Sequence, residues 1–153
     1  MRTLSQFATT MFGLLAGGMV LIAAGLVPYW RSLESAEFTQ VFAASLPTVA
    51  GTMIVLTILG TGSMVLAAGL AMWKQQPERL WLVAGAAATL LMLVCVPLYF
   101  GSANSLLAGG TLSADAITAE LATWQQIHWF RTIVSILGLF CAVRAGYVAS
   151  NSN

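Results

Sequence analysis

The most polar segment inside the apolar part of this chain is ATWQQIHWFRT, residues 122–132. It contains the only histidine, His128, and Arg131 three residues later, and it leads directly into the apolar run IVSILGLFCAV. An imidazole can take up or release a proton, and a guanidinium offers a fixed fork of hydrogen-bond donors. Helical spacing places five residues on one stripe: Trp124, His128, Arg131, Thr132 and Ser135. The pattern makes this stripe a candidate functional site.

The composition excludes most other settings for such a site. Of the 153 residues, 59% are hydrophobic and 7% are charged, with a mean hydropathy of +0.87 and a formal net charge of +1. A soluble domain carries about 25% charged residues, so we expect the lipid bilayer to be the main partner. Nucleic acid is not an expected partner, because binding phosphates requires clustered Lys and Arg.

Four apolar stretches are long enough to cross a bilayer, which takes about 20 residues each. They cover roughly residues 7–30, 46–73, 80–100 and 124–147. We therefore predict an all-α fold, a four-helix transmembrane bundle built from two helical hairpins, with residues 1–153 as one integral membrane domain. The first stretch, preceded by Arg2, could alternatively be a signal peptide, but it is too long for one and lacks an A-x-A site.

The distribution of positive charge predicts the orientation. Arg2, Lys74, Arg79 and Arg144 fall on one side, whereas Arg31 shares the other side with the acidic residues Glu34, Glu37, Asp115 and Glu120. Because Lys and Arg in short loops favour the cytoplasm, we expect both termini to be cytoplasmic. The two longer connections, 31–45 and 101–123, would then face outward. The expected location is the inner (plasma) membrane of a bacterium.

The two halves share short sequence matches. LVPYW (26–30) resembles CVPLYF (95–100), and TILG (57–60) resembles SILG (135–138). The matches indicate a parallel repeat about an axis normal to the membrane, although apolar helices also produce chance matches.

Rows of small residues allow helices to pack closely. Gly13 and Gly17 form one row, and Gly138, Ala142 and Gly146 form another. Such rows favour packing in a bundle, in a homo-oligomer or within a larger membrane complex.

Depth in the membrane is the reason to expect His128 and Arg131 to face inward. Arg131 and Arg144 are 13 residues apart on one helix, a rise of about 20 Å, whereas the hydrocarbon core is about 30 Å thick. If Arg144 reaches the cytoplasmic surface, Arg131 and His128 lie within the outer third of the bilayer. A charge there is costly unless it faces the bundle interior. The alternatives are an ordinary interfacial histidine and an arginine that reaches the headgroups.

Other residues fall at the same depth and predict an outward-facing pocket. Pro28 and Pro97 should free the carbonyl groups of Ala24 and Leu93. The expected ligand-binding residues around His128 and Arg131 are Trp30, Tyr99, Asn104, Trp124 and Thr132. The aromatic residues could equally belong to the interfacial belts of the membrane, and Asn104 could simply end the third helix.

Metal and cofactor sites are poorly supported by the sequence. One histidine and two separated cysteines, Cys95 and Cys141, with no carboxylate on the stripe, do not make a metal site, so we expect neither a metal nor a cofactor. Haem bound through His128 stays open as an alternative, as does a Ser-His-Asp arrangement using Asp115 or Glu120. A disulfide between the cysteines is the less favoured reading.

The C-terminal half resembles the anthrone-oxygenase-like family of small four-helix membrane proteins. The resemblance rests on VPLYFGSANSLLAGG and on WQQIHWFRT, with a proline in the third helix, an Asn beyond it and a W-x3-H-x2-R-T signature. The matching residues are Pro97, Asn104, Trp124, His128, Arg131 and Thr132. The first hairpin is similar in layout.

This resemblance implies an activity: oxidation of anthrones to anthraquinones by O2, without a bound metal or flavin. His128 would be the base, Arg131 would stabilise the oxyanion, and Trp30, Tyr99 and Trp124 would hold the rings. We therefore expect a cofactor-independent oxygenase for an anthrone- or quinol-like lipophilic aromatic. The alternatives are a non-enzymatic accessory or scaffold subunit of a larger complex, and a binding protein for a hydrophobic ligand.

Overall fold

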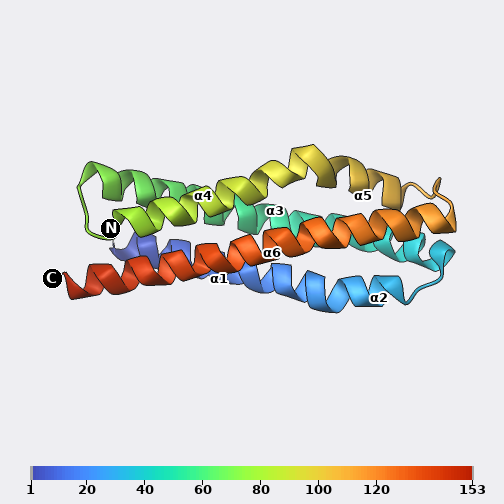
Figure 1. Ribbon diagram of the computed structural model, residues 1–153, viewed down its shortest axis with the longest axis horizontal. Helices are drawn as coiled ribbons and strands as arrows, with labels where there is room; N and C mark the ends of the chain where they lie inside the picture. Colours follow the sequence, from blue (N-terminus) through green and yellow to red (C-terminus); the bar gives the residue numbers. More distant parts are fainter. Residues whose placement is uncertain (1, 153) are drawn as a thin grey trace.

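The protein is a long, antiparallel four-helix bundle with both termini at one end (Figure 1). The computed structural model describes residues 2–152; residues 1 and 153 and the side chain of Arg2, used above to predict orientation, lie outside the described part. The elements are α1 (Arg2–Leu21), η1 (Ile22–Leu26), α2 (Val27–Arg31), α3 (Ser35–Trp73), α4 (Arg79–Cys95), η2 (Val96–Phe100), α5 (Gly101–Ala108) and α6 (Ala114–Asn151). Four continuous helical segments are long and apolar enough to cross a membrane. The expected all-α four-helix bundle is confirmed.

The helices extend well beyond the spans expected from hydropathy. α3 has 39 residues and α6 has 38, so most of the expected loops 31–45 and 101–123 are helical. Phe38 and Phe42, four residues apart, bury one face of the first turns of α3. Ser113 caps α6, where its hydroxyl accepts a hydrogen bond from the Ala116 N–H at 3.3 Å. These extensions are amphipathic helices, which a hydropathy threshold does not detect.

Exposed apolar side chains mark the part of the bundle that fits a membrane. On α3 the exposed large hydrophobic residues run from Ile54 to Trp73, and on α6 they run from Trp129 to Tyr147. At 1.5 Å per residue each run is about 28 Å long, close to the hydrocarbon thickness of about 30 Å. We call this zone the apolar belt. The end of the bundle that carries the turns 32–34 and 109–113, the distal end, projects beyond it.

Two wide helical turns interrupt the first and third spans beside their prolines. In η1 the N–H of Val27 donates to the carbonyl of Ile22, and in η2 the N–H of Gly101 donates to that of Val96, both five residues back. Such π-turns accommodate the missing N–H of a following or enclosed proline. The Leu93 carbonyl, expected to be free, instead accepts from the Val96 N–H. Each half thus has the same order: an interrupted helix and then a long continuous one.

The core has two apolar clusters arranged along the bundle. One lies toward the termini and includes Phe12, Leu15 and Met64; the other lies toward the distal end and includes Trp30, Phe42 and Phe100. Of the second small-residue row, Gly138 and Ala142 are buried, and Gly138 lies against Phe12 of α1. That part of the row therefore packs within the bundle, and only Gly146 stays open.

The contact at Gly138 gives a stability test. A Cβ there would lie 2.5 Å from Phe12 Cε1 and 3.2 Å from Ala88 Cβ, whereas one at Gly146 would meet nothing within 4 Å. Gly138→Ala should therefore lower the free energy of unfolding by about 1–3 kcal/mol. Gly146→Ala, the matched control on the same helix, should leave it unchanged or raise it slightly. Reversible unfolding in detergent micelles measures both; equal effects would show that the helices are not packed as described.

Candidate functional site

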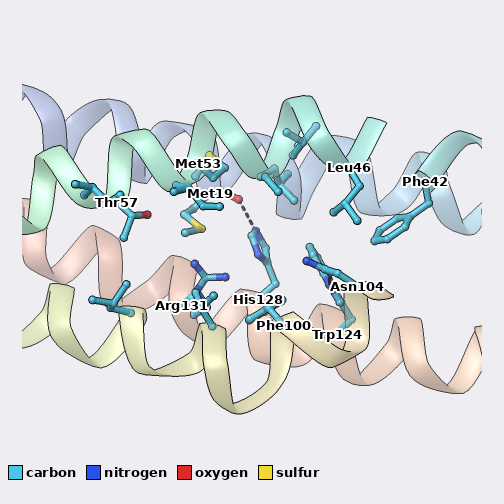
Figure 2. Close-up of a pocket in the computed structure, with 18 of the residues that line it drawn as sticks. Met19, Phe42, Leu46, Met53, Thr57, Phe100, Asn104, Trp124, His128 and Arg131 are labelled. Atoms are coloured by element: carbon cyan, nitrogen blue, oxygen red, sulfur yellow. Dashed lines mark hydrogen bonds between the residues drawn. The ribbon is translucent and has the colours of Figure 1, made fainter. Parts of the chain in front are cut away.

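A cavity of about 500 Å³ lies at the distal edge of the apolar belt. α3 forms one side of it and the α4–η2–α5 segment the other, while α6 and the junction of α1 with η1 form the remaining wall (Figure 2). Most of the lining is apolar, as in Met19, Met53, Val96 and Phe100. The volume is within the range of small-molecule sites, about 300–1,000 Å³.

His128 is held in place by contacts on two sides. Its ring stacks on Trp124, with ring centroids 4.8 Å apart and an angle of 14° between the planes. Its Nε2 lies 3.0 Å from the carbonyl oxygen of Met19, in the last turn of α1 before η1. Because a carbonyl can only accept, Nε2 carries the hydrogen. In the neutral ring the lone pair is then on Nδ1, which is buried and has no hydrogen-bond partner.

Trp124 and Asn104 form the end of the cavity nearest the distal turns. Trp124 Nε1 donates to Asn104 Oδ1 at 2.8 Å. Since an indole N–H is only a donor, this bond sets the orientation of the amide and leaves the NH2 group of a cavity-lining residue as a free donor. Trp30 and Phe100 pack edge-on against Trp124, with centroids 5.7 and 5.2 Å away. The result is an aromatic wall with one amide donor.

Arg131 lies at the opposite end of the lining of α6. It is 7% exposed, its Cζ lies 4.5 Å from the centroid of the Phe100 ring, and its Nε is buried without a partner. Figure 2 shows its terminal nitrogens directed into the space between α3 and the segment that carries Phe100. No carboxylate in the described part of the chain pairs with it. The cavity therefore contains a desolvated cation whose donors are free.

The structure brings together five of the seven expected site residues. Trp30, Asn104, Trp124, His128 and Arg131 all line the cavity, and the whole α6 stripe, including Ser135, is buried. Tyr99 and Thr132 do not line it. Tyr99 donates to Glu120 Oε1 at 2.7 Å, and Thr132 turns back to the His128 carbonyl of its own helix at 2.9 Å.

Sequence reasoning missed the contribution of Phe100 and of the α3 wall. The extra residue in the π-turn η2 rotates the residues after it by about 100° around the helix axis, which directs Phe100 inward in place of Tyr99. Thr57 of α3, whose hydroxyl points toward the cavity in Figure 2, lies in an apolar stretch. In the sequence, the feature that could have identified Thr57 is a single hydroxyl residue in an apolar stretch, at the same depth in the membrane as Arg131.

The open alternatives for His128 meet geometric obstacles. Haem ligation through Nε2 would break the bond to Met19. Asp115, 13 residues before His128 on the same helix, is about 20 Å away along the axis, and Glu120 is engaged by Tyr99. Within residues 2–152 no group of three or more His, Cys, Asp or Glu side chains could hold a metal. Cys95 and Cys141 are free thiols.

Comparison of the chain with protein-family models, with characterised proteins and with solved structures finds no match. The resemblance to the anthrone-oxygenase-like family therefore stays a prediction that rests on the residues quoted above.

The unpaired guanidinium predicts that the protein becomes more stable when Arg131 is made apolar. Removing a charge from water costs several kcal/mol, and contact with one aromatic face returns about 2 kcal/mol. Arg131→Met should therefore raise the free energy of unfolding, by about 1–4 kcal/mol. Reversible unfolding of the protein in detergent measures the change.

Arg144→Met is the matched control. Arg144 lies on the same helix over the rings of Trp81 and Tyr147 and is not buried, so we expect little change. A marked loss of stability in Arg131→Met would show that Arg131 has a structural role and that the site is assigned incorrectly.

Proposed function

We propose that the protein binds a flat, lipophilic, oxygen-bearing aromatic molecule in this cavity and oxidises it with O2 without a cofactor. The observation that carries the proposal is the guanidinium of Arg131, buried in an apolar cavity with no anionic partner. A ligand oxygen that carries or develops negative charge would offset the cost of that burial. No side chain in the cavity lining carries a carboxylate that could pair with Arg131.

The shape and polarity of the lining support a ring system. Trp30, Phe100 and Trp124 supply aromatic faces and edges, which favour planar ligands. The free donors lie at two levels along the bundle. Asn104 lies beside Trp124 of α6, and Arg131 is seven residues after Trp124 on the same helix. The rise between these levels is about 10 Å, which suits a molecule with an oxygen at each end.

The residues could promote the reaction of an anthrone in a definite order. Loss of a proton from the ring CH2 gives an enolate, whose oxyanion pairs with Arg131. O2 adds to the deprotonated carbon, the removed proton returns to the peroxide oxygen to give a hydroperoxide, and loss of water from it yields the anthraquinone. The balance is anthrone plus O2 to anthraquinone plus water. Nδ1 of His128, which has no hydrogen-bond partner, is the proposed proton acceptor.

The orientation and location proposed from the sequence fit the arrangement of charges. Lys74, Arg79 and Arg144 lie toward the end that carries the termini, whereas Glu34 and Asp115 lie at the distal turns. The positive-inside rule then makes the termini cytoplasmic. The site would lie at the outer edge of the membrane, which we propose is a bacterial inner membrane.

Exposed glycines on α3 support a second candidate function, an accessory or scaffold subunit. Gly62 and Gly69 lie seven residues apart on one face, and a Cβ at either would meet nothing within 4 Å. Small residues on an open face allow another helix, or a second copy, to pack closely. Crosslinking in native membranes separates this candidate from an enzyme that acts alone.

Turnover of anthrone tests the proposed oxidation. The purified protein in lipid nanodiscs should consume anthrone and O2 in equal amounts and release anthraquinone. Arg131→Gln and His128→Gln should each lower the rate about 100-fold, because they remove the oxyanion donor and the base. Arg144→Gln should match the unaltered protein.

Three other outcomes would contradict the proposal, in its site or in its activity. Equal rates for all variants would remove the catalytic role of the site. Saturable binding of anthrone with no turnover would make the protein a carrier or sensor, and no binding at all would favour the scaffold.

A further inference from the structure

The cavity has its exposed lining on one side only. Ile54 and Ile58 of α3 are 53% and 63% exposed, Leu93 of α4 is 40% exposed, and Gly101 at the start of α5 is exposed, yet all four line the cavity. They belong to facing elements, α3 on one side and the α4–η2–α5 segment on the other (Figure 2). An opening therefore lies between these two elements.

That opening is at the depth of the apolar belt. Ile54 is the first and Ile58 the next-but-one exposed large hydrophobic residue of α3 in the belt. Ile58 is thus about 6 Å inside the edge of the hydrocarbon zone. A molecule leaving through this opening would enter lipid tails and not water.

The distal end of the cavity, by contrast, is filled. Trp30, Phe38 and Phe42 are buried, with Trp30 edge-on to Phe42 at 5.0 Å between centroids and Phe38 against Phe42 at 5.3 Å. Beyond them Arg31 donates to Gln125 Oε1 at 2.7 Å, which joins α2 to α6. The pocket was expected to face outward; in the structure, packed rings separate it from the outer aqueous side.

We infer that the ligand enters from within the bilayer through the opening between α3 and α4–η2, and that it carries a hydrocarbon tail that stays in the lipid while its ring binds at Arg131. This inference rests on the proposed binding of an oxygen-bearing ring. The cavity of about 500 Å³ has room for a ring system, and a long tail would lie outside it beside Ile58 and Leu93. The substrate class is therefore a membrane-dissolved, alkylated anthrone or quinol.

A pair of probes with one ring and two tails tests the inference. 2-Methyl- and 2-decyl-1,4-naphthoquinone are titrated into the protein in nanodiscs, with quenching of tryptophan fluorescence as the signal and affinities referred to the concentration in the membrane. A tail that stays in lipid costs nothing, so the two affinities should be equal. A tail withdrawn from lipid would cost about fourfold in affinity per CH2 group, which makes the decyl probe weaker by more than about 1,000-fold.

A variant that narrows the opening provides the second arm. Ile58→Trp should weaken the decyl probe by at least about tenfold, because the tail must pass the larger side chain. Because Ile58 also lines the cavity, the methyl probe should weaken too, but by less than about threefold, and its retained binding shows that the variant is folded. Leu66→Trp, two turns further along α3 on an exposed residue outside the cavity lining, is the matched control and should change neither.

The outcomes separate this inference from the proposed function. The side opening would be overturned if the unaltered protein bound only the methyl probe, or if Ile58→Trp bound the decyl probe as tightly as the unaltered protein does. Either result would leave the ring site standing. Binding of neither probe would overturn the ring site, and the side opening with it.

Discussion

The distal half of this bundle contains one buried cation, the guanidinium of Arg131, and the free-energy cost of its burial limits how the surrounding helices can be arranged. Arg131 is on the buried stripe of α6, near the edge of the hydrocarbon zone, and its guanidinium lies over the face of Phe100 with no anionic partner among the described residues. Such a charge is retained in a membrane protein when it binds something or couples to a partner. The interruptions in the neighbouring helices and the cavity itself are best understood in relation to this charge.

The two π-turns create the space that the guanidinium faces. η2 carries Phe100 toward Arg131, and η1 follows the Met19 carbonyl that receives the hydrogen bond of His128. A regular α-helix in place of η2 would rotate Phe100 by about one residue, or 100°, away from Arg131. The prolines beside the turns explain why the interruptions occur at these points. The site is therefore held by backbone features on α1 and α4 as much as by side chains on α6.

Most polar side chains around the cavity form hydrogen bonds with near neighbours, so the few polar atoms without partners are informative. Asn104 satisfies Trp124, and Thr132 and Ser135 satisfy carbonyl groups of α6. His128 Nδ1 and Arg131 Nε remain without partners. Buried polar groups are usually paired, so two unpaired groups about one turn apart on α6 support the proposed ligand site. If these two groups served only to stabilise the fold, we would expect each to have a hydrogen-bond partner within the protein, such as a carboxylate.

Much of the fold and part of the site could be predicted from the sequence. Long apolar runs predict four spans, and the spacing of Trp124, His128 and Arg131 predicts a shared face, because both depend on composition and helical periodicity. The lengths of α3 and α6 could not be predicted that way, since Phe38 and Ile117 are on amphipathic turns and Pro47 favours a helix start. The exchange of Tyr99 for Phe100 depends on the π-turn, and the closed distal end depends on tertiary packing of Trp30 with Phe42.

In the proposed complex the guanidinium of Arg131 donates directly to an oxygen of the bound ring. Infrared difference spectroscopy of the protein with a naphthoquinone labelled with ¹³C at one carbonyl tests this contact without relying on turnover. We expect a C=O stretch shifted to lower frequency for the oxygen at Arg131, and the loss of that shift in Arg131→Met. An identical carbonyl spectrum in the two proteins, with the quinone bound in both, would contradict it.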